Sequence, residues 1–410
     1  MTQHDRERIR RLAAEVAAIA ALPVQEEKKR LWKRLNALRP ERPMVMIDQV
    51  CWNEMNVDNE LTLQCEDRDA RYWEWRLLET LYRWRHFPVD MVVEPVVRVP
   101  MAVTHTGFGI QVEEEIRSLD PSSSVVSHAY QNQFQTEKDI EKIQTPIAQH
   151  DEAETARRLE VAHHLFDGLL EVVPWGWEPY FSVWDPLSMW MSVGEALTAL
   201  VDRPDFVLEI VHRMVQGYMA LLDQMEQNGW LCGPQPWIHC TGGFTDELPA
   251  PGYDPAHPRA RDIWTFGLAQ MLGTVSPTMF EEFEIRPCLP FFQRFGLVYY
   301  GCCDPLHDKI EQVSLIPNVR KISVSPWADE EIAARKIGPR WVYSRKPNPA
   351  LLAGPSFSEE AVRDHLQRSV EIARRYGCPI ELILKDISTV AYQPQRLWRW
   401  AEIAMSVVTR

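Results

Sequence analysis

Hydrophobic and polar positions follow two different periods along this chain. Apolar residues recur at helical spacing between charged residues, which predicts amphipathic helices, in segments 8–21, 26–38, 67–86, 152–172, 204–227, 260–272, 276–295, 307–315, 328–336, 358–376 and 394–408. Short apolar runs that end at turn-forming residues predict buried strands, at 44–47, within 92–103, and at 180–183, 236–239, 296–301, 321–324, 341–343 and 380–384. From about residue 150 onward, helices and strands alternate.

This alternation favours a parallel sheet, because strands separated by single helices form parallel βα units. The predicted strands are close in number to the eight of a closed TIM barrel. We therefore predict an α/β protein with a (β/α)8 TIM barrel over residues 89–410. Residues 1–88 are predicted to form a helical N-terminal extension that includes the first strand. A doubly wound open sheet is the alternative, although no Gly-rich phosphate loop follows the first strand.

The composition excludes several classes of function. With 45% hydrophobic and 25% charged residues, the chain has ample material for a globular core. Its formal net charge of −14 argues against nucleic-acid binding, which needs a basic surface. No apolar segment approaches membrane-spanning length and the polar N-terminus carries no secretory signal, so we expect a cytoplasmic protein without membrane contact. The aromatic face of segment 67–86 suits either the core or a homodimer interface.

The strand predicted at 296–301 ends in a crowded group of reactive side chains. Cys302, Cys303 and Asp304 follow it directly, and His307 lies a few residues further on. Because α/β folds place their chemistry at the carboxyl ends of strands, this segment indicates an enzyme. Thiolates and imidazoles bind zinc, so Cys302, Cys303 and His307 are a candidate metal site. In the alternative, adjacent thiols point to opposite faces of the strand, and only Cys302 faces the barrel.

A second predicted strand, at 236–239, ends in His239 and leads into a loop with two adjacent glycines. Asp246 follows these glycines, which permit close approach of the backbone to a ligand. We predict that both residues bind substrate. A buried, hydrogen-bonded His239 and a solvated Asp246 are the alternatives.

Charged and aromatic residues mark two further strand ends. Lys385 and Asp386 interrupt the apolar run of the last strand, where a charge is costly unless it is paired or functional. We predict that both are catalytic, with a structural ion pair as the alternative. Trp184 and Asp185 follow the strand at 180–183 and are predicted to line the substrate pocket, although core packing also explains a tryptophan there.

Several motifs occur in order over residues 136–408. They are Thr136-Glu137-Lys138-Asp139-Ile140-Glu141-Lys142-Ile143, Phe181-Ser182-Val183-Trp184-Asp185-Pro186, Ser276-Pro277-Thr278-Met279-Phe280-Glu281-Glu282-Phe283, Tyr300-Gly301-Cys302-Cys303-Asp304 and Lys346-Pro347-Asn348-Pro349. In order and spacing this set resembles the uroporphyrinogen decarboxylase superfamily, which includes the corrinoid-linked methyltransferases. The third motif is similar to that family's Ser-Pro-x-x-Phe-x-Glu-Phe helix start, and the fourth to its His-x-Cys-Gly-Asp strand end. The resemblance implies a (β/α)8 barrel.

The chain also departs from the family pattern. Uroporphyrinogen decarboxylases carry an Arg-rich N-terminal motif that grips substrate carboxylates, whereas the corresponding segment here, residues 44–49, contains no arginine. The methyltransferase branch holds zinc with its His-x-Cys pair and a further Cys near the last strand. Cys302 matches the first Cys, but Tyr300 stands in place of the His, and Lys385 and Asp386 end the last strand without a Cys.

The resemblance implies a methyltransferase that moves a methyl group between a corrinoid protein and a small thiol, folate or methylated substrate. Methylcobalamin would be supplied by that partner protein, and zinc or a free thiolate at Cys302 would take part in the transfer. Tyr300 is then predicted to contact the substrate together with His239, Asp246, Trp184 and Asp185. A decarboxylase or other lyase acting on a small non-tetrapyrrole acid is the alternative. A degenerate barrel that binds without turnover is a third hypothesis.

Overall fold

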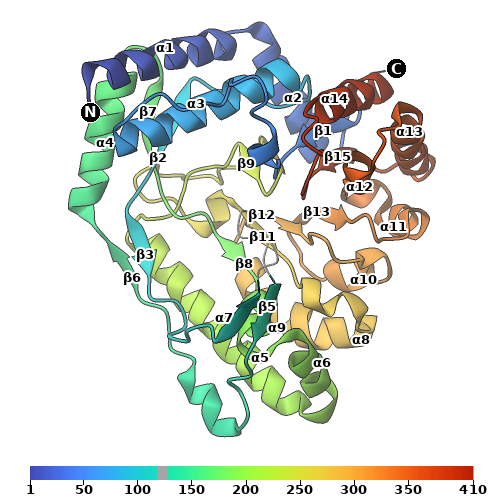
Figure 1. Ribbon diagram of the computed structural model, residues 1–410. Coiled ribbons are helices and arrows are strands. Elements are labelled where there is room, and N and C mark those ends of the chain that lie inside the picture. The colour runs from blue at the N-terminus through green and yellow to red at the C-terminus, as the bar shows by residue number, and fades with distance from the viewer. Residues whose placement is uncertain (118–126, 410) are drawn as a thin grey trace.

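The computed structural model describes residues 1–117 and 127–409, and its centre is a seven-stranded sheet. The strands lie in the order β1-β15-β14-β13-β12-β11-β8, and all neighbouring pairs are parallel (Figure 1). Their bounds are β1 Met44–Ile47, β8 Tyr180–Phe181, β11 Trp264–Gly267, β12 Leu297–Tyr300, β13 Val319–Val324, β14 Val342–Arg345 and β15 Ile380–Leu384. Because all of these strands run in one direction, their carboxyl ends share one edge of the sheet.

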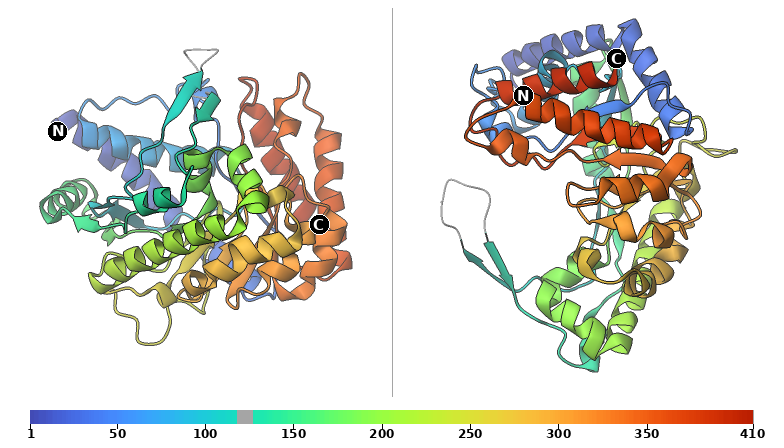
Figure 2. Two further views of the ribbon diagram at one scale, coloured as in Figure 1. Left: turned by 90° about the horizontal axis from the view of Figure 1, so that it is seen from below. Right: turned by 90° about the vertical axis from the view of Figure 1, so that its right-hand side faces the viewer.

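Helices surround the sheet (Figures 1 and 2). The α-helices are α1 Gln3–Ala20, α2 Pro23–Asn36, α3 Arg68–His86, α4 Glu152–Phe166, α5 Trp184–Met191, α6 Val193–Asp202, α7 Pro204–Gln227, α8 Pro277–Phe280, α9 Arg286–Phe292, α10 Ile310–Val313, α11 Glu330–Ile337, α12 Ala350–Ala353, α13 Glu359–Arg375 and α14 Gln395–Val408. A π-helical turn, η5 (Glu281–Ile285), joins α8 to α9. In the part of the chain that the structure describes, no helix is long and apolar enough to cross a membrane.

Among the described residues, four small two-stranded ladders lie outside the central sheet. They are β2 Val96–Pro100 with β7 Glu171–Trp175, β3 Val103–His105 with β6 Ala148–His150, β4 Glu114–Arg117 with β5 Ser127–Tyr130, and β9 Trp237–Ile238 with β10 Thr241–Gly242. The β4–β5 pair projects from the body of the molecule (Figure 2). Two strands that we counted toward the barrel, within 92–103 and at 236–239, therefore belong to separate ladders.

The α/β prediction is confirmed, whereas the closed eight-stranded barrel is not. Within residues 1–117 and 127–409, no ladder joins the two end strands, β1 and β8. The sequence also predicted a helix at 260–272, but its centre is strand β11. All four residues of β11 are buried, so their hydrophobicity shows no period that distinguishes a strand from a helix.

Side chains of the strands alternate between two cores. In β12, Leu297 and Tyr299 pack with Trp264 and Cys302 on the inner side, whereas Val298 and Tyr300 belong to the large outer core that the helices cover. This is the ordinary two-residue period of a strand. Cys302 and Cys303 therefore lie on the inner side of the sheet.

Helix α2 covers the opposite end of the inner side. Its Leu31, Trp32 and Leu35 pack with Met44 at the start of β1 and Val342 at the start of β14. The Trp32 indole N–H donates to the carbonyl of Asp90 at 2.9 Å, which ties α2 to the segment beside β1. α2 therefore fills the amino-terminal end of the inner core, and the polar groups gather toward the carboxyl edge.

Candidate active site

The candidate site forms where β12, β14 and β15 end. Cys302 lies two residues beyond β12, Lys346 directly follows β14, and Lys385 directly follows β15. His239 joins them from the turn between β9 and β10. Its backbone has a φ of 34°, and that of Asp386 a φ of 55°, a left-handed conformation that costs non-glycine residues energy. Such strain is common at functional sites, where the surrounding structure holds it in place.

A cation–thiol contact is the centre of this site. Lys385 Nζ lies 2.8 Å from Cys302 Sγ, and both residues are buried, with 2% and 5% of their surface exposed. The same Nζ lies 3.4 Å from His239 Nε2. The imidazole of His239 is itself stacked on Phe266 at 3.6 Å between ring centroids, which fixes its position. The chain thus holds a buried ammonium group directly against a sulfur atom.

These contacts make Cys302 a thiolate. The hydrogen bond from the Cys303 thiol, the contact with His239 and the charge of Lys385 lower the pKa of Cys302 to about 3, although burial opposes this shift. The same hydrogen bond, across 3.7 Å between the two sulfur atoms, raises the pKa of Cys303, as does its burial. Burial favours neutral Lys385, but the negative charge of Cys302 outweighs it and raises the pKa of the lysine. At neutral pH the site therefore holds a thiolate, a thiol and an ammonium group.

The thiolate stands beside a cavity of about 370 Å3. Its lining includes Cys303, Lys346, Lys385 and Asp386, together with the indole of Trp327, which is 70% exposed at the surface. Cys303 Sγ also lies 3.1 Å from the Asp386 carboxylate, so its single proton can point to either Cys302 or Asp386. Lys385 forms an ion pair with the same carboxylate at 3.3 Å. The cavity is large enough for a small organic molecule and presents both cations to it.

A second buried cation, Lys346, connects the cavity to a polar network in the inner core. Its Nζ donates to the hydroxyl of Tyr299 and, at 2.7 Å, to Ser344 Oγ. Ser344 in turn donates to Glu381 at 2.6 Å. Burial lowers the pKa of Lys346 to about 8. This lysine can therefore both carry a charge and exchange a proton near neutral pH.

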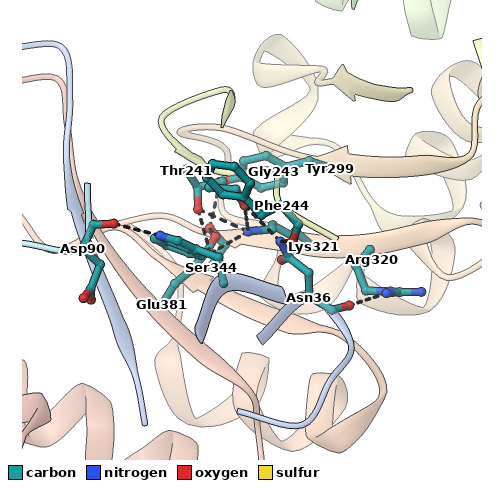
Figure 3. A network of polar contacts seen from close by, with 12 residues as sticks. Asn36, Asp90, Thr241, Gly243, Phe244, Tyr299, Arg320, Lys321, Ser344 and Glu381 are labelled. Atoms are coloured by element: carbon teal, nitrogen blue, oxygen red, sulfur yellow. Dashed lines mark hydrogen bonds and ion pairs between the residues drawn. The ribbon is translucent and has the colours of Figure 1, made fainter. Parts of the chain in front are cut away.

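The network continues to a fully buried ion pair (Figure 3). Lys321 Nζ lies 2.7 Å from Glu381 Oε2, and neither side chain is exposed. Thr241 donates to the same oxygen at 2.8 Å, and Lys321 also donates to the carbonyl of Gly242 at 3.1 Å. Buried charges are tolerated when they are paired and hydrogen-bonded, as these are. The pair anchors Ser344 and hence the position of Lys346.

The structure brings most of the predicted reactive residues together. Cys302, Cys303, Lys385, Asp386 and His239 form one cluster. Asp185 lies close enough that, besides burial, the charge of Cys302 helps raise the pKa of its carboxyl group. The hydroxyl of Tyr180 donates to Asp185 at 2.8 Å.

Four predicted site residues lie elsewhere. Tyr300 and Trp184 donate to the buried Glu284 at 2.8 and 3.0 Å on the outer side of the sheet, because Tyr300 alternates with the inward-facing Tyr299. Asp246 is 78% exposed and pairs with Lys33 of α2. His307 lies in the short helix η6 (Leu306–Asp308), and its buried Nδ1 has no hydrogen-bond partner among the described residues.

The predicted zinc ligands do not form a metal site in this geometry. Among residues 1–117 and 127–409, no group of three or more His, Cys, Asp or Glu side chains is arranged to hold a metal ion. Lys385 occupies the position beside Cys302 Sγ that a cation would need. His307 is not among the groups that contact either sulfur. The donor set therefore does not fit zinc, and a Lys–thiolate contact supplies the positive charge instead.

A larger cavity, of about 600 Å3, lies away from the cysteines, beside α3 and β2. Its charged residues pair with one another, as in Arg83 with Asp48 at 3.2 Å and Arg98 with Glu94 at 2.7 Å. It contains neither a thiol nor an unpaired lysine in its lining. The smaller cavity beside the thiolate is therefore the better candidate for chemistry.

Sequence reasoning missed the inner network. Glu381 is the single charge in the otherwise apolar strand β15, which is the same signal that identified Lys385, whereas Lys321 follows Arg320 in β13. Lys346 was visible only as part of a turn motif. Tyr299 and Ser344 carry no signal of their own, because a single tyrosine or serine in a strand is ordinary.

The comparisons with known proteins support the fold. No protein-family model matches this chain, and no curated protein matches its sequence. Among solved structures, the fold is similar to that of a methyltransferase from Methanosarcina mazei, with a TM-score of 0.50 and 11% sequence identity. The match covers 92% of this chain and 96% of that methyltransferase. The likeness thus extends over nearly the whole chain, while membership of the uroporphyrinogen decarboxylase superfamily stays a prediction.

Proposed function

We propose that this protein is a methyltransferase in which the Cys302 thiolate is the sulfur that reacts with the methyl group. The observation that carries the proposal is the 2.8 Å contact between Cys302 and Lys385 beside a cavity of about 370 Å3. A thiolate is a strong nucleophile toward a methyl carbon, whereas a thiol is not. The fold shared with a methyltransferase is consistent with this activity but does not by itself establish it.

Each residue of the site has a separate role in this methyl transfer. The electron pair of Cys302 forms the new sulfur–carbon bond while the bond between the methyl group and its carrier breaks, and the leaving group keeps the electrons of that bond. Lys385 stabilises the thiolate, and His239 holds it in place. Lys346 lines the same cavity and takes a proton from an acceptor such as a small thiol.

We further propose that the methyl group is exchanged with a corrinoid carried by a partner protein, which would supply a methyl-carrying cobalt. When the methyl group then passes to the acceptor thiolate, the acceptor sulfur supplies the electron pair of the new bond. The electron pair of the broken sulfur–carbon bond returns to Cys302, and its thiolate is regenerated. Trp327 lines the cavity and Tyr392 is 69% exposed, so large apolar groups are available for a partner to cover.

The experiment is a methyl-transfer assay with methylcobalamin as donor and a panel of small thiols as acceptors, followed by the absorbance of the corrinoid. Cys302→Ser is expected to reduce the rate to background. Cys378→Ser is the matched control, because this buried cysteine only donates to the carbonyl of Ala334, and it should keep the wild-type rate. Wild-type activity in Cys302→Ser would remove the proposed role of the thiolate.

A decarboxylase is the second candidate, because two buried ammonium groups, Lys346 and Lys385, line one cavity and could together hold a substrate carboxylate. It predicts carbon dioxide release from a small acid, with a rate that survives Cys302→Ser. Carbon dioxide release that requires both lysines but not the thiol would favour the decarboxylase over the methyltransferase.

A further inference from the structure

Two adjacent thiols with different surroundings lie at the candidate site. Cys302 Sγ and Cys303 Sγ are 3.7 Å apart. All eight cysteines of the chain are free, and the seven other than Cys303 are buried. Cys303 is partly exposed and lines the cavity of about 370 Å3. A small solute in this cavity can therefore reach Cys303, and the buried Cys302 sulfur lies directly behind it at 3.7 Å.

The two sulfur atoms carry complementary reactivity. Cys302 lies against the ammonium group of Lys385 at 2.8 Å, an arrangement that keeps a thiolate in place. Cys303 keeps its proton, which points either to the Cys302 sulfur at 3.7 Å or to the Asp386 carboxylate at 3.1 Å. Redox-sensitive cysteines are commonly accessible thiolates with a second, resolving cysteine beside them. Here the resolving cysteine is the next residue in the chain.

We propose that Cys302 and Cys303 form an oxidative modification site, at which a hydroperoxide converts the two thiols into a reversible vicinal disulfide. The inference goes beyond the methyl transfer proposed above and does not rest on it, because it concerns only the reactivity of the two sulfur atoms.

The chemistry balances with hydrogen peroxide as the oxidant. The Cys302 thiolate attacks one peroxide oxygen, a sulfur–oxygen bond forms, the oxygen–oxygen bond breaks, and the hydroxide that leaves takes a proton from solvent. Cys303 then gives its proton, by way of Asp386, to the departing hydroxide while its sulfur attacks the sulfenic sulfur of Cys302. One disulfide and two water molecules result, so the two thiols lose two electrons and the peroxide gains them.

The local backbone makes this disulfide strained and therefore easy to reduce. Consecutive Cα atoms lie about 3.8 Å apart, whereas disulfides usually span roughly 4.4–6.8 Å between Cα atoms. The sulfur atoms must also approach from 3.7 Å to about 2.0 Å. Gly301, at a φ of 90°, begins an irregular segment that can adjust. Strained disulfides have more oxidising potentials and are the labile ones, so mild dithiols should restore both thiols.

The test treats the full-length protein with hydrogen peroxide, blocks the remaining thiols and maps the cysteine-containing peptides by mass spectrometry. The peptide with Cys302 and Cys303 is expected to lose two hydrogens and no blocking groups should attach to it, so the count of eight free thiols falls by two. A mild dithiol should reverse the change. Because this readout needs neither a variant nor a substrate, it stands whether or not the methyltransferase proposal holds.

Two variants separate the roles of the sulfur atoms. In Cys303→Ser, the sulfenic acid on Cys302 has no resolving thiol and should be trapped by a cyclic 1,3-dione. In Cys302→Ser, Cys303 should remain a free thiol under the same peroxide treatment. The proposal is overturned if both wild-type thiols stay free, or if Cys302 passes to the sulfinic acid while Cys303 remains reduced.

Discussion

Lys385 and Cys302 decide the chemistry of the site at the scale of single residues. An ammonium group within hydrogen-bonding distance of a buried sulfur favours the negative form of that sulfur, because little water is present to screen the attraction. Two separate turns of the chain, after β12 and after β15, bring the two groups to 2.8 Å.

Replacing Lys385 by methionine tests this electrostatic role. Because an opposite charge at this distance lowers a pKa by roughly 1–3 units, the pH profile for alkylation of Cys302 by iodoacetamide should move upward by about that amount. The bonds from Cys303 and His239 remain, so some of the depression should persist. Lys336→Met is the control, since this lysine pairs with Glu311 at the surface. An unchanged profile in Lys385→Met would show that the lysine does not hold the thiolate.

The sequence did not indicate which of two adjacent tyrosines points into the inner core. Tyr299 and Tyr300 are neighbours of the same type, yet Tyr299 contacts Lys346 in the inner core and Tyr300 contacts Glu284 on the outer side. Successive side chains of a strand point to opposite faces, so a shift of one residue would exchange the positions of the two tyrosines. The residues around this pair are apolar on both faces and do not indicate which tyrosine points inward. The choice of Tyr300 as a substrate residue followed from sequence alignment with a motif, not from the direction of its side chain.

At the scale of elements, helix α2 is fixed by a close contact with the β9–β10 hairpin. A Cβ atom on Gly242 would lie 2.5 Å from the indole ring of Trp32, closer than real contacts allow. The indole cannot move freely, because its N–H donates to the carbonyl of Asp90. Gly242 is therefore required by packing and not by its backbone angles.

Gly242→Ala should destabilise the fold by about 1–3 kcal/mol, the usual cost of overpacking a core. Urea unfolding followed by tryptophan fluorescence measures the change. Gly194→Ala in α6 is the control, because a Cβ atom there meets nothing within 4 Å, and its stability should be unchanged or slightly higher. Equal stability of wild type and Gly242→Ala would contradict the packing of α2 against the hairpin.

Elements with one exposed side were the best predicted. The expected helix at 204–227 coincides with α7. α7 shows a clear apolar stripe because one side packs and the other meets water. Strand β11 was harder, since all four of its residues are buried and it has no polar face.

At the scale of the whole molecule, Glu284 links stability to pH. Its carboxyl group is buried in the π-helical turn η5 between Trp184 and Tyr300. Burial raises the pKa of Glu284 to about 8, although its hydrogen bonds oppose this shift. In the unfolded chain, Glu284 has an ordinary glutamate pKa of about 4.3 and loses its proton at a lower pH than in the folded protein.

The sign of the effect follows from this difference in bound protons. The contribution of Glu284 to stability is fully present below about pH 4.3 and is lost as the pH rises toward about 8. The melting temperature of the wild type should thus fall between about pH 5 and about pH 8, by an amount equivalent to a few kcal/mol. In Glu284→Gln, whose amide does not titrate, scanning calorimetry should show a smaller fall. An identical pH dependence in the two proteins would exclude a titrating Glu284.

The sequence by itself determined the α/β class, the positions of the long helices and the concentration of reactive groups at strand ends. Those features follow from the local periodicity of apolar residues and from the energetic cost of burying a charge that is neither paired nor functional. Only the tertiary structure decided that Lys385 stands against Cys302, and that Lys346 joins the site through Ser344 and Glu381. Contacts between residues 302 and 385 depend on the order of the parallel strands. The near-continuous apolar runs of buried parallel strands do not indicate which strand lies beside which.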